Sequence, residues 1–193
     1  MAKSSKNGQR LRWIISITLW TFVLAVILGF VSYIFFTRYT SLLPALLILF
    51  LVIFMGIAFD LVGTAAAAAS EVPLNAKASR KVPGARRAVY LVKHADQVAN
   101  FCNDVVGDIS GIVSGTITAL IVVKLVAAFP GLSELALGII LTALVAALTV
   151  GGKAWGKAIA INYCTDIILL VGKIITKLES PFDSMALRRR DSR

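Results

Sequence analysis

The chain is poor in the residues that build disulfide scaffolds, zinc sites and polar surfaces. It has two cysteines, one histidine and five prolines among 193 residues, and 16% of its residues are charged. Soluble domains carry about 25% charged residues. Two cysteines are too few for the disulfide framework of a small secreted protein, and one histidine leaves little material for a His/Cys zinc site. With 58% hydrophobic residues, the composition also excludes a disordered chain and an ordinary soluble enzyme.

The charges that are present are strongly biased toward one sign. Lys and Arg number 20 against 10 Asp and Glu, which gives a formal net charge of +10. A chain that is both very apolar and very basic must keep the two properties in separate segments. The sequence therefore predicts an all-α integral membrane protein with basic aqueous segments. The excess of basic residues then indicates how the chain is oriented in the membrane. Because orientation accounts for this charge, we expect no nucleic-acid partner.

Long apolar runs supply the predicted transmembrane helices. A helix needs about 20 apolar residues to cross the hydrocarbon core. Four crossings are expected, at residues 13–36, 42–59, 102–129 and 135–150. The second continues past Asp60 through the alanine run 65–69. We expect the first to be an uncleaved anchor, because no small-residue cleavage site follows it.

The distribution of basic residues predicts the topology. With the N-terminus inside and four crossings, nearly all of the 20 basic residues face the cytoplasm. Only Arg38 and Lys124 fall outside, and Lys124 can snorkel from a helix end. Because cytoplasmic loops attract Lys and Arg, we expect both termini in the cytoplasm. The plasma (inner) membrane is the expected location.

Two weaker apolar segments are amphipathic. Residues 85–99 and 159–178 each place apolar side chains on one helical face and charged ones elsewhere, which is typical of helices lying at the cytoplasmic interface. For 159–178, a fifth short crossing is the alternative. The expected organisation is a basic N-terminus with an anchor (1–40), a core (41–178) with juxtamembrane helices at about 75–99 and 154–178, and a basic tail (179–193). The lone His94 is expected at the solvated surface.

Several polar residues fall within the predicted crossings. Asp60 lies near the cytoplasmic end of the second crossing, and Asp104 and Asp108 share a helix face at the start of the third, beside Asn103. Charges at bilayer depth are costly and therefore indicate function. Carboxylate and amide oxygens are the ligands of a hard cation such as Mg²⁺. The alternative is that these acids pair with lysines or stabilise the N-terminus of the third helix.

A stripe of small residues follows these acids. Gly107, Gly111 and Gly115 repeat every four residues, which lets another helix approach closely. The partner is either the alanine run 65–69 or the same stripe in a second copy. No phosphate-binding loop, HExxH motif or nucleophile–base pair is present, so we expect no enzymatic activity.

Three motifs together resemble the transmembrane domain of the cyclin M / CorC-type magnesium transporters. They are Phe-Asp-Leu-Val-Gly-Thr-Ala at 59–65, the basic segment 84–96 leading to Asn-Asp-Val-Val at 103–106, and Gly-Lys-Ala-Trp-Gly-Lys-Ala-Ile-Ala at 152–160. The resemblance spans about residues 41–178. It implies a three-crossing core with cytoplasmic juxtamembrane helices, a homodimer, and an inward-facing cavity that binds Mg²⁺. Carried over by position, its ligands are Asp60, Asn103, Asp104 and Gly152.

The chain departs from the family at several of these positions. Lys153 stands where the family carries an acid, and two serines of the first motif are Asp60 and Val62. The leading hypothesis is a divalent-cation transporter or carrier, with Mg²⁺ as the candidate ion. The alternative is a non-transporting adaptor in which Lys153 neutralises the acids and the basic segments meet membrane lipid.

Overall fold

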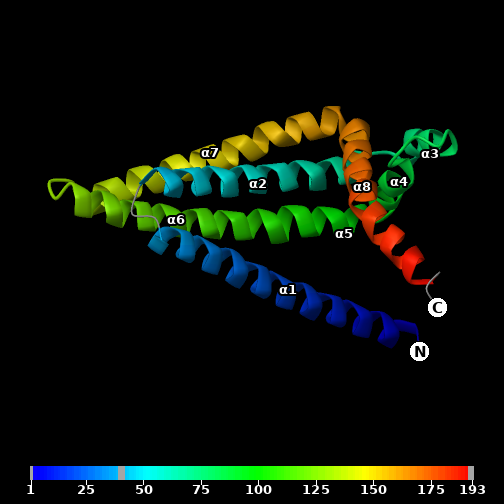
Figure 1. Cartoon of the computed structure of the whole chain (residues 1–193), viewed down its shortest axis with the longest axis horizontal. Helices are drawn as coiled ribbons and strands as arrows, with labels where there is room; N and C mark the ends of the chain where they lie inside the picture. The colour runs from blue at the N-terminus through cyan, green and yellow to red at the C-terminus, as the bar shows by residue number, and fades with distance from the viewer. Residues whose placement is uncertain (1, 39–41, 191–193) are drawn as a thin grey trace. The chain divides into compact units, whose positions relative to one another are not determined.

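All regular secondary structure in the residues that the structure describes is helical. The computed structural model describes the backbone of residues 2–38 and 42–190, and the side chains of 15–31, 33–34 and 42–179. The expected all-α class is confirmed, since every regular element in these ranges is a helix. The elements are α1 (Ala2–Arg38), α2 (Leu42–Ala68), α3 (Glu71–Ser79), α4 (Ala85–Lys93), α5 (Ala95–Ala99), η1 (Asn100–Val106), α6 (Gly107–Ala128), α7 (Glu134–Asn162) and α8 (Cys164–Arg190) (Figure 1).

The length and composition of three helical segments support a membrane protein. These are α2, the continuous segment Ala95–Ala128 and α7. Of their most apolar windows, 28% is buried in α2, 44% in Ala95–Ala128, and none in α7. A helix that buries none of its apolar window within the chain needs an apolar surrounding such as lipid. In α1 the described apolar stretch is shorter, at Ile15–Val31.

Several helix boundaries differ from the sequence prediction. The amphipathic segment 85–99 is divided at His94, and its second part belongs to the continuous helical segment Ala95–Ala128, which was expected to begin at 102. The fourth predicted crossing ends at Val150, whereas α7 continues to Asn162. The segment expected to lie on the membrane from about 154 to 178 is therefore divided. Its first part extends α7, and its second part belongs to α8, which begins at Cys164. Glycines interrupt the apolar run near residue 151, but they do not break the hydrogen-bonded backbone of the helix.

The chain forms two compact units, which are described separately. Unit 1 comprises Met1–Ile57 and Asp104–Gly152, and unit 2 comprises Ala58–Asn103 and Lys153–Arg193. The core of unit 1 is built from aliphatic side chains of α2, η1, α6 and α7, with α1 packed against it through Leu24 and Leu28. The fully packed members of this core are Ala45, Leu49, Val52, Ile53, Val105, Ile109, Val113, Ile117, Ile121 and Val145.

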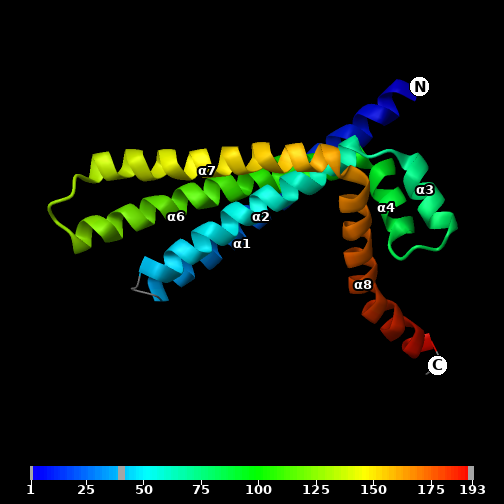
Figure 2. The ribbon, with the colours of Figure 1, turned by 90° about the horizontal axis from the view of Figure 1, so that it is seen from above.

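Unit 2 is held together by short side chains. Its helix α4 lies between α3 and α8 (Figure 2). The amphipathic pattern predicted for this segment is present, since Ala85 and Ala88 are 0% exposed while Arg86 and Arg87 are exposed. Alanines at the contact allow helices to approach closely. The buried members of this core are Ala65, Ala66, Leu74, Ala85, Ala88, Ala160, Ile168 and Leu169.

The closest contact between two backbone segments of unit 2 occurs at Gly84, the N-cap of α4. Its φ of +80° is left-handed, a conformation that glycine adopts at little cost. A Cβ at this position would lie 2.7 Å from the carbonyl carbon of Gly172 and from the Cα of Lys173. Position 84 therefore requires glycine for two reasons, the backbone conformation and the contact with α8.

Candidate functional site

Asp60 is the most deeply buried charged residue in the described part of the chain. It lies on the portion of α2 that belongs to unit 2, and it is 3% exposed. Burial removes the water that stabilises a carboxylate, so such a group needs compensation by charge or hydrogen bonds. One of its oxygens, Oδ2, has no hydrogen-bond partner. Asp60 therefore keeps an acceptor atom available within the protein interior.

The compensating charge comes from Lys157 on α7. Its Nζ lies 3.8 Å from Oδ1 of Asp60, and the lysine side chain is 50% exposed while that of Asp60 is 4% exposed. At this separation the pair is electrostatic and is longer than a hydrogen bond. Because the lysine is half-exposed on a flexible stem, its ammonium can move into water without unfolding the helix. The arrangement is a buried anion with a movable counter-charge.

Asn103 supplies a second unused oxygen in unit 2. Its Oδ1 is buried and has no hydrogen-bond partner. The residue lies in η1, the π-helical segment, a geometry that occurs often at functional sites. Its side chain contacts Gly63 of α2 so closely that a Cβ at position 63 would lie 2.9 Å from Cγ of Asn103. Glycine at 63 is therefore what allows the amide to reach α2.

Asn103 contacts α2 at Gly63, which lies three residues after Asp60. Residues three apart on a helix are surface neighbours, so the Asn103 amide at Gly63 lies one turn from the Asp60 carboxylate. Among the described residues, these two side chains hold the only buried polar atoms that lack a hydrogen-bond partner. Both atoms are hard oxygen acceptors, which suit a cation or a proton donor. We call Asp60, Asn103 and Lys157 the acceptor site.

The other predicted ligands belong to unit 1. Asp104 and Asp108 are both exposed, on η1 and in the first turn of α6. Both lie within the continuous helical segment Ala95–Ala128, so neither marks the N-terminal end of a helix. Gly152 packs against Ile57, whose Cγ1 would be 3.1 Å from a Cβ at position 152. The structure thus groups Asp60 with Asn103, and Asp104, Asp108 and Gly152 with the apolar unit.

The hydroxyl residues of α6 are satisfied by their own helix. Ser110, Ser114 and Thr118 are each 2% exposed. Their hydroxyls donate to the carbonyls of Gly107, Gly111 and Ser114 at 2.9, 2.9 and 2.7 Å. This back-bonding lets a polar side chain sit in an apolar core. The polar face of α6 therefore carries no unused hydroxyl hydrogen for a ligand.

The small-residue stripe of α6 is only partly packed. Gly107 is buried, Gly111 is half-buried and Gly115 is exposed. A Cβ at either Gly111 or Gly115 would meet no atom within 4 Å. The tight contact of α6 lies instead at Ser110, whose Cβ would be 3.0 Å from a Cβ at Gly56. The alanines expected as partners of the stripe, Ala65 and Ala66, are buried in the core of unit 2.

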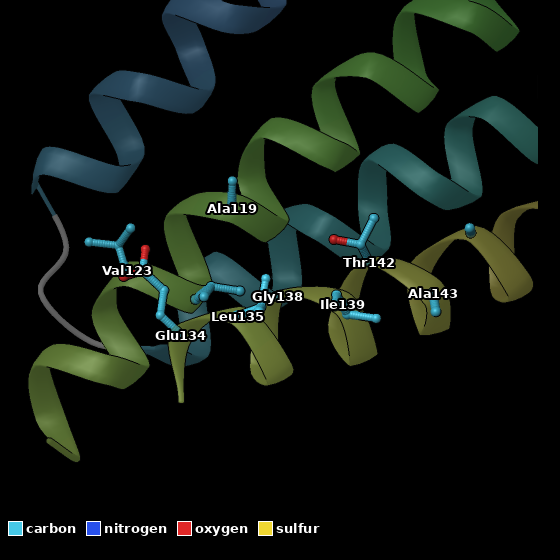
Figure 3. A pocket seen from close by; sticks show the side chains of 10 residues that line it. Ala119, Val123, Glu134, Leu135, Gly138, Ile139, Thr142 and Ala143 are labelled. Atoms are coloured by element: carbon cyan, nitrogen blue, oxygen red, sulfur yellow. The ribbon is translucent and has the colours of Figure 1, made fainter. Parts of the chain in front are cut away.

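An apolar hollow of about 930 Å³ lies between α6 and α7 in unit 1. Figure 3 shows Ala119 and Val123 of α6 on one side and Gly138, Ile139 and Thr142 of α7 on the other. Glu134 is its one charged lining residue. The lining offers almost no polar chemistry, so the hollow suits a hydrocarbon surrounding better than a hydrated ion.

The sequence indicated Lys153 as the lysine that would neutralise the acids. The ion pair that the structure records at Asp60 is made by Lys157, one helical turn further along α7. Two lysines four residues apart share a face, and the sequence contains no signal that distinguishes them. The unused oxygen of Asn103 and its contact with Gly63 were likewise visible only in three dimensions.

No group of three or more His, Cys, Asp or Glu side chains is arranged to hold a metal within the described residues. Comparison of the chain with protein-family models, curated proteins and solved structures found no match. The chemical argument for function therefore rests on the acceptor site itself.

Proposed function

We propose that the protein is a membrane carrier of a divalent cation, with Mg²⁺ as its first candidate cargo. The observation that carries this proposal is the pair of buried oxygens, Asp60 Oδ2 and Asn103 Oδ1, that have no hydrogen-bond partner. Mg²⁺ takes oxygen ligands and usually keeps several waters, so one carboxylate and one amide form a sufficient protein contribution. The resemblance to cyclin M / CorC-type transporters suggests which divalent ion to test first.

Lys157 has a defined role in this mechanism. In the absence of a cation its ammonium compensates Asp60, and an arriving divalent ion replaces it because both neutralise the same carboxylate. The half-exposed lysine then moves into water. The exchange would keep a positive charge beside the buried carboxylate in both states, and the divalent ion would leave the site one charge more positive than the lysine does. The lysine thus limits affinity, and a carrier must release its cargo.

The proposed arrangement in the membrane has four crossings, with α1 as the first. The apolar stretch Ile15–Val31 and the three longer apolar segments support it. The basic residues of α3, α4 and α8 support a cytoplasmic position for these helices, with both termini inside the plasma (inner) membrane. Assembly as a homodimer is part of the same proposal, and the open positions Gly111 and Gly115 favour α6 as the contact.

A non-transporting membrane adaptor is the second candidate. The observation that favours it is the Lys157–Asp60 pair, which already neutralises the buried acid. In this proposal the lysine is a permanent counter-charge, and the basic helices of unit 2 bind anionic lipid. The two candidates therefore differ in whether Lys157 can be displaced by a cation.

Calorimetric titration of the purified full chain with Mg²⁺, Mn²⁺ and Co²⁺ tests the proposal. We expect Asp60→Asn to weaken Mg²⁺ binding by about tenfold or more, because a charged ligand is lost from a buried site. Lys157→Met should strengthen binding, because a competing positive charge is removed. The matched control is Asp166→Asn, which makes the same chemical change at an exposed acid of unit 2.

Mg²⁺ flux into proteoliposomes separates binding from transport. A carrier loses flux in Asp60→Asn and keeps it in Asp166→Asn. Absence of heat with all three ions, in the wild type and in Lys157→Met, would overturn the carrier proposal and leave the adaptor.

A further inference from the structure

A small cavity lies beside the turn between α3 and α4 in unit 2. Its volume is about 310 Å³, and it is lined by Ala78, Lys81, Val82, Gly84, Arg86 and Thr176. All of these residues belong to unit 2. The cavity is separate in chain position from the acceptor site, and it carries charge of the opposite sign.

Lys81 and Arg86 are the charged residues of this lining, and no acid contributes to it. Neither side chain forms an ion pair within the described part of the chain. Elsewhere in the same unit, Lys77 pairs with Asp166 and Arg87 pairs with Glu179. The cavity therefore has two cations in its lining, with no ion pair to either among the described residues.

The two cations flank the turn that leads into α4. Lys81 has a left-handed φ of +57°, which is uncommon for a residue with a side chain. Arg86 lies in the first turn of α4, whose N-cap, Gly84, provides no side-chain hydrogen bond. The positive end of the helix dipole thus adds to the charge of the two side chains. The Thr176 hydroxyl donates to the carbonyl of Gly172 at 2.8 Å, so its hydrogen is already used.

We propose that this cavity binds a phosphate group. A phosphate monoester carries more than one negative charge and several strong acceptor oxygens, which match two cationic donors converging on a small space. The phosphate belongs either to a lipid headgroup or to a free phosphate ion. This inference stands independently of the proposed cation transport, since it uses different residues and an anionic ligand.

Native mass spectrometry of the full chain in detergent, titrated with phosphatidic acid, tests the proposal. We expect Lys81→Asn and Arg86→Gln each to weaken binding by about fivefold, the value of one basic residue near an anionic phosphate. Asparagine tolerates the left-handed backbone at position 81, so Lys81→Asn removes charge without adding strain. The matched control is Lys93→Gln, which removes one charge from α4 outside the cavity and should leave binding unchanged.

Two further arms identify the source of the phosphate. Inorganic phosphate that binds the wild type and displaces phosphatidic acid identifies the phosphate group itself as sufficient. Binding of phosphatidic acid alone, with the same pattern among the variants, identifies a lipid headgroup. Equal weakening by Lys93→Gln and Lys81→Asn would show general surface attraction and overturn the proposal, as would a lack of effect in both Lys81→Asn and Arg86→Gln.

Discussion

The two units of the protein differ in whether their buried polar side-chain atoms are hydrogen-bonded. In unit 1 the buried polar residues Ser110, Ser114 and Thr118 bond to carbonyls of their own helix. In unit 2 the buried Asp60 and Asn103 each keep an oxygen without a hydrogen-bond partner. An unsatisfied buried acceptor costs about 1–3 kcal/mol, so its retention needs a reason. The contrast is why our proposal places the cation site in unit 2 and gives unit 1 no ligand.

Helix α2 contributes residues to both units, and it makes a close contact through a glycine in each of them. At Gly56 in unit 1 it approaches the hydroxyl residue Ser110, and at Gly63 in unit 2 it approaches the amide of Asn103. Both contacts depend on the absence of a side chain. A glycine of α2 therefore allows a close side-chain contact in each unit, with Ser110 in unit 1 and with Asn103 in unit 2.

The largest difference in stability between variants of the two units is expected when a glycine is replaced by alanine. Gly84→Ala should destabilise the protein by about 3 kcal/mol or more, because it adds a left-handed alanine and a clash with the backbone of α8. Gly111→Ala in unit 1 should change stability by about 1 kcal/mol or less, since a Cβ there meets nothing within 4 Å. Thermal unfolding in detergent measures both. Equal losses in the two variants would contradict the assignment of Gly84 as the tightest contact.

An intermediate effect is expected at Gly63. Alanine there should cost about 2 kcal/mol, because its Cβ would lie 2.9 Å from the Cβ of Cys102 and collide with the Asn103 amide. Adding Asn103→Ser should recover part of that loss, because the shorter side chain withdraws from α2. A double-mutant cycle on unfolding temperature measures the coupling. Strict additivity of the two substitutions would mean that Asn103 and Gly63 do not contact each other.

The smallest effect is expected from the ion pairs. Lys157→Met should destabilise the protein by about 1 kcal/mol, because it leaves the buried Asp60 uncompensated while the lysine itself was half-exposed. Lys77→Met breaks the more exposed pair with Asp166 and should change stability by no more than a few tenths of a kcal/mol. Chemical denaturation resolves the difference. Combining Lys157→Met with Asp60→Asn should restore stability, and continued loss in the double variant would show that Lys157 acts through packing.

Much of the secondary structure was predictable because hydrophobic periodicity is a local property. The apolar runs predicted the helices, and the helical spacing of apolar residues in 85–99 predicted the amphipathic pattern that α4 shows. Boundaries were less accurate, since α7 continues through glycines to Asn162. Within an already hydrogen-bonded helix, a glycine costs about 1 kcal/mol, which packing can offset.

The candidate site was predictable only in part. An acid in an apolar run stands out in any sequence, so Asp60 was identified from its surroundings. Its partner Lys157 was not, because Lys153 and Lys157 share a helical face and residue spacing does not say which of them pairs with Asp60. The unused oxygen of Asn103 depends on the path of η1 and on its contact with Gly63, neither of which follows from residue spacing.

The sequence by itself indicated a membrane environment for this protein, and it determined the periodicity of its helices. Apolar length and charge distribution are sums over neighbouring residues, and they need no knowledge of the fold. Only the tertiary structure decided which polar atoms remain unsatisfied and which cations remain unpaired. Those properties depend on contacts between distant segments, such as Gly63 with Asn103, Asp60 with Lys157, and the α3–α4 turn with α8.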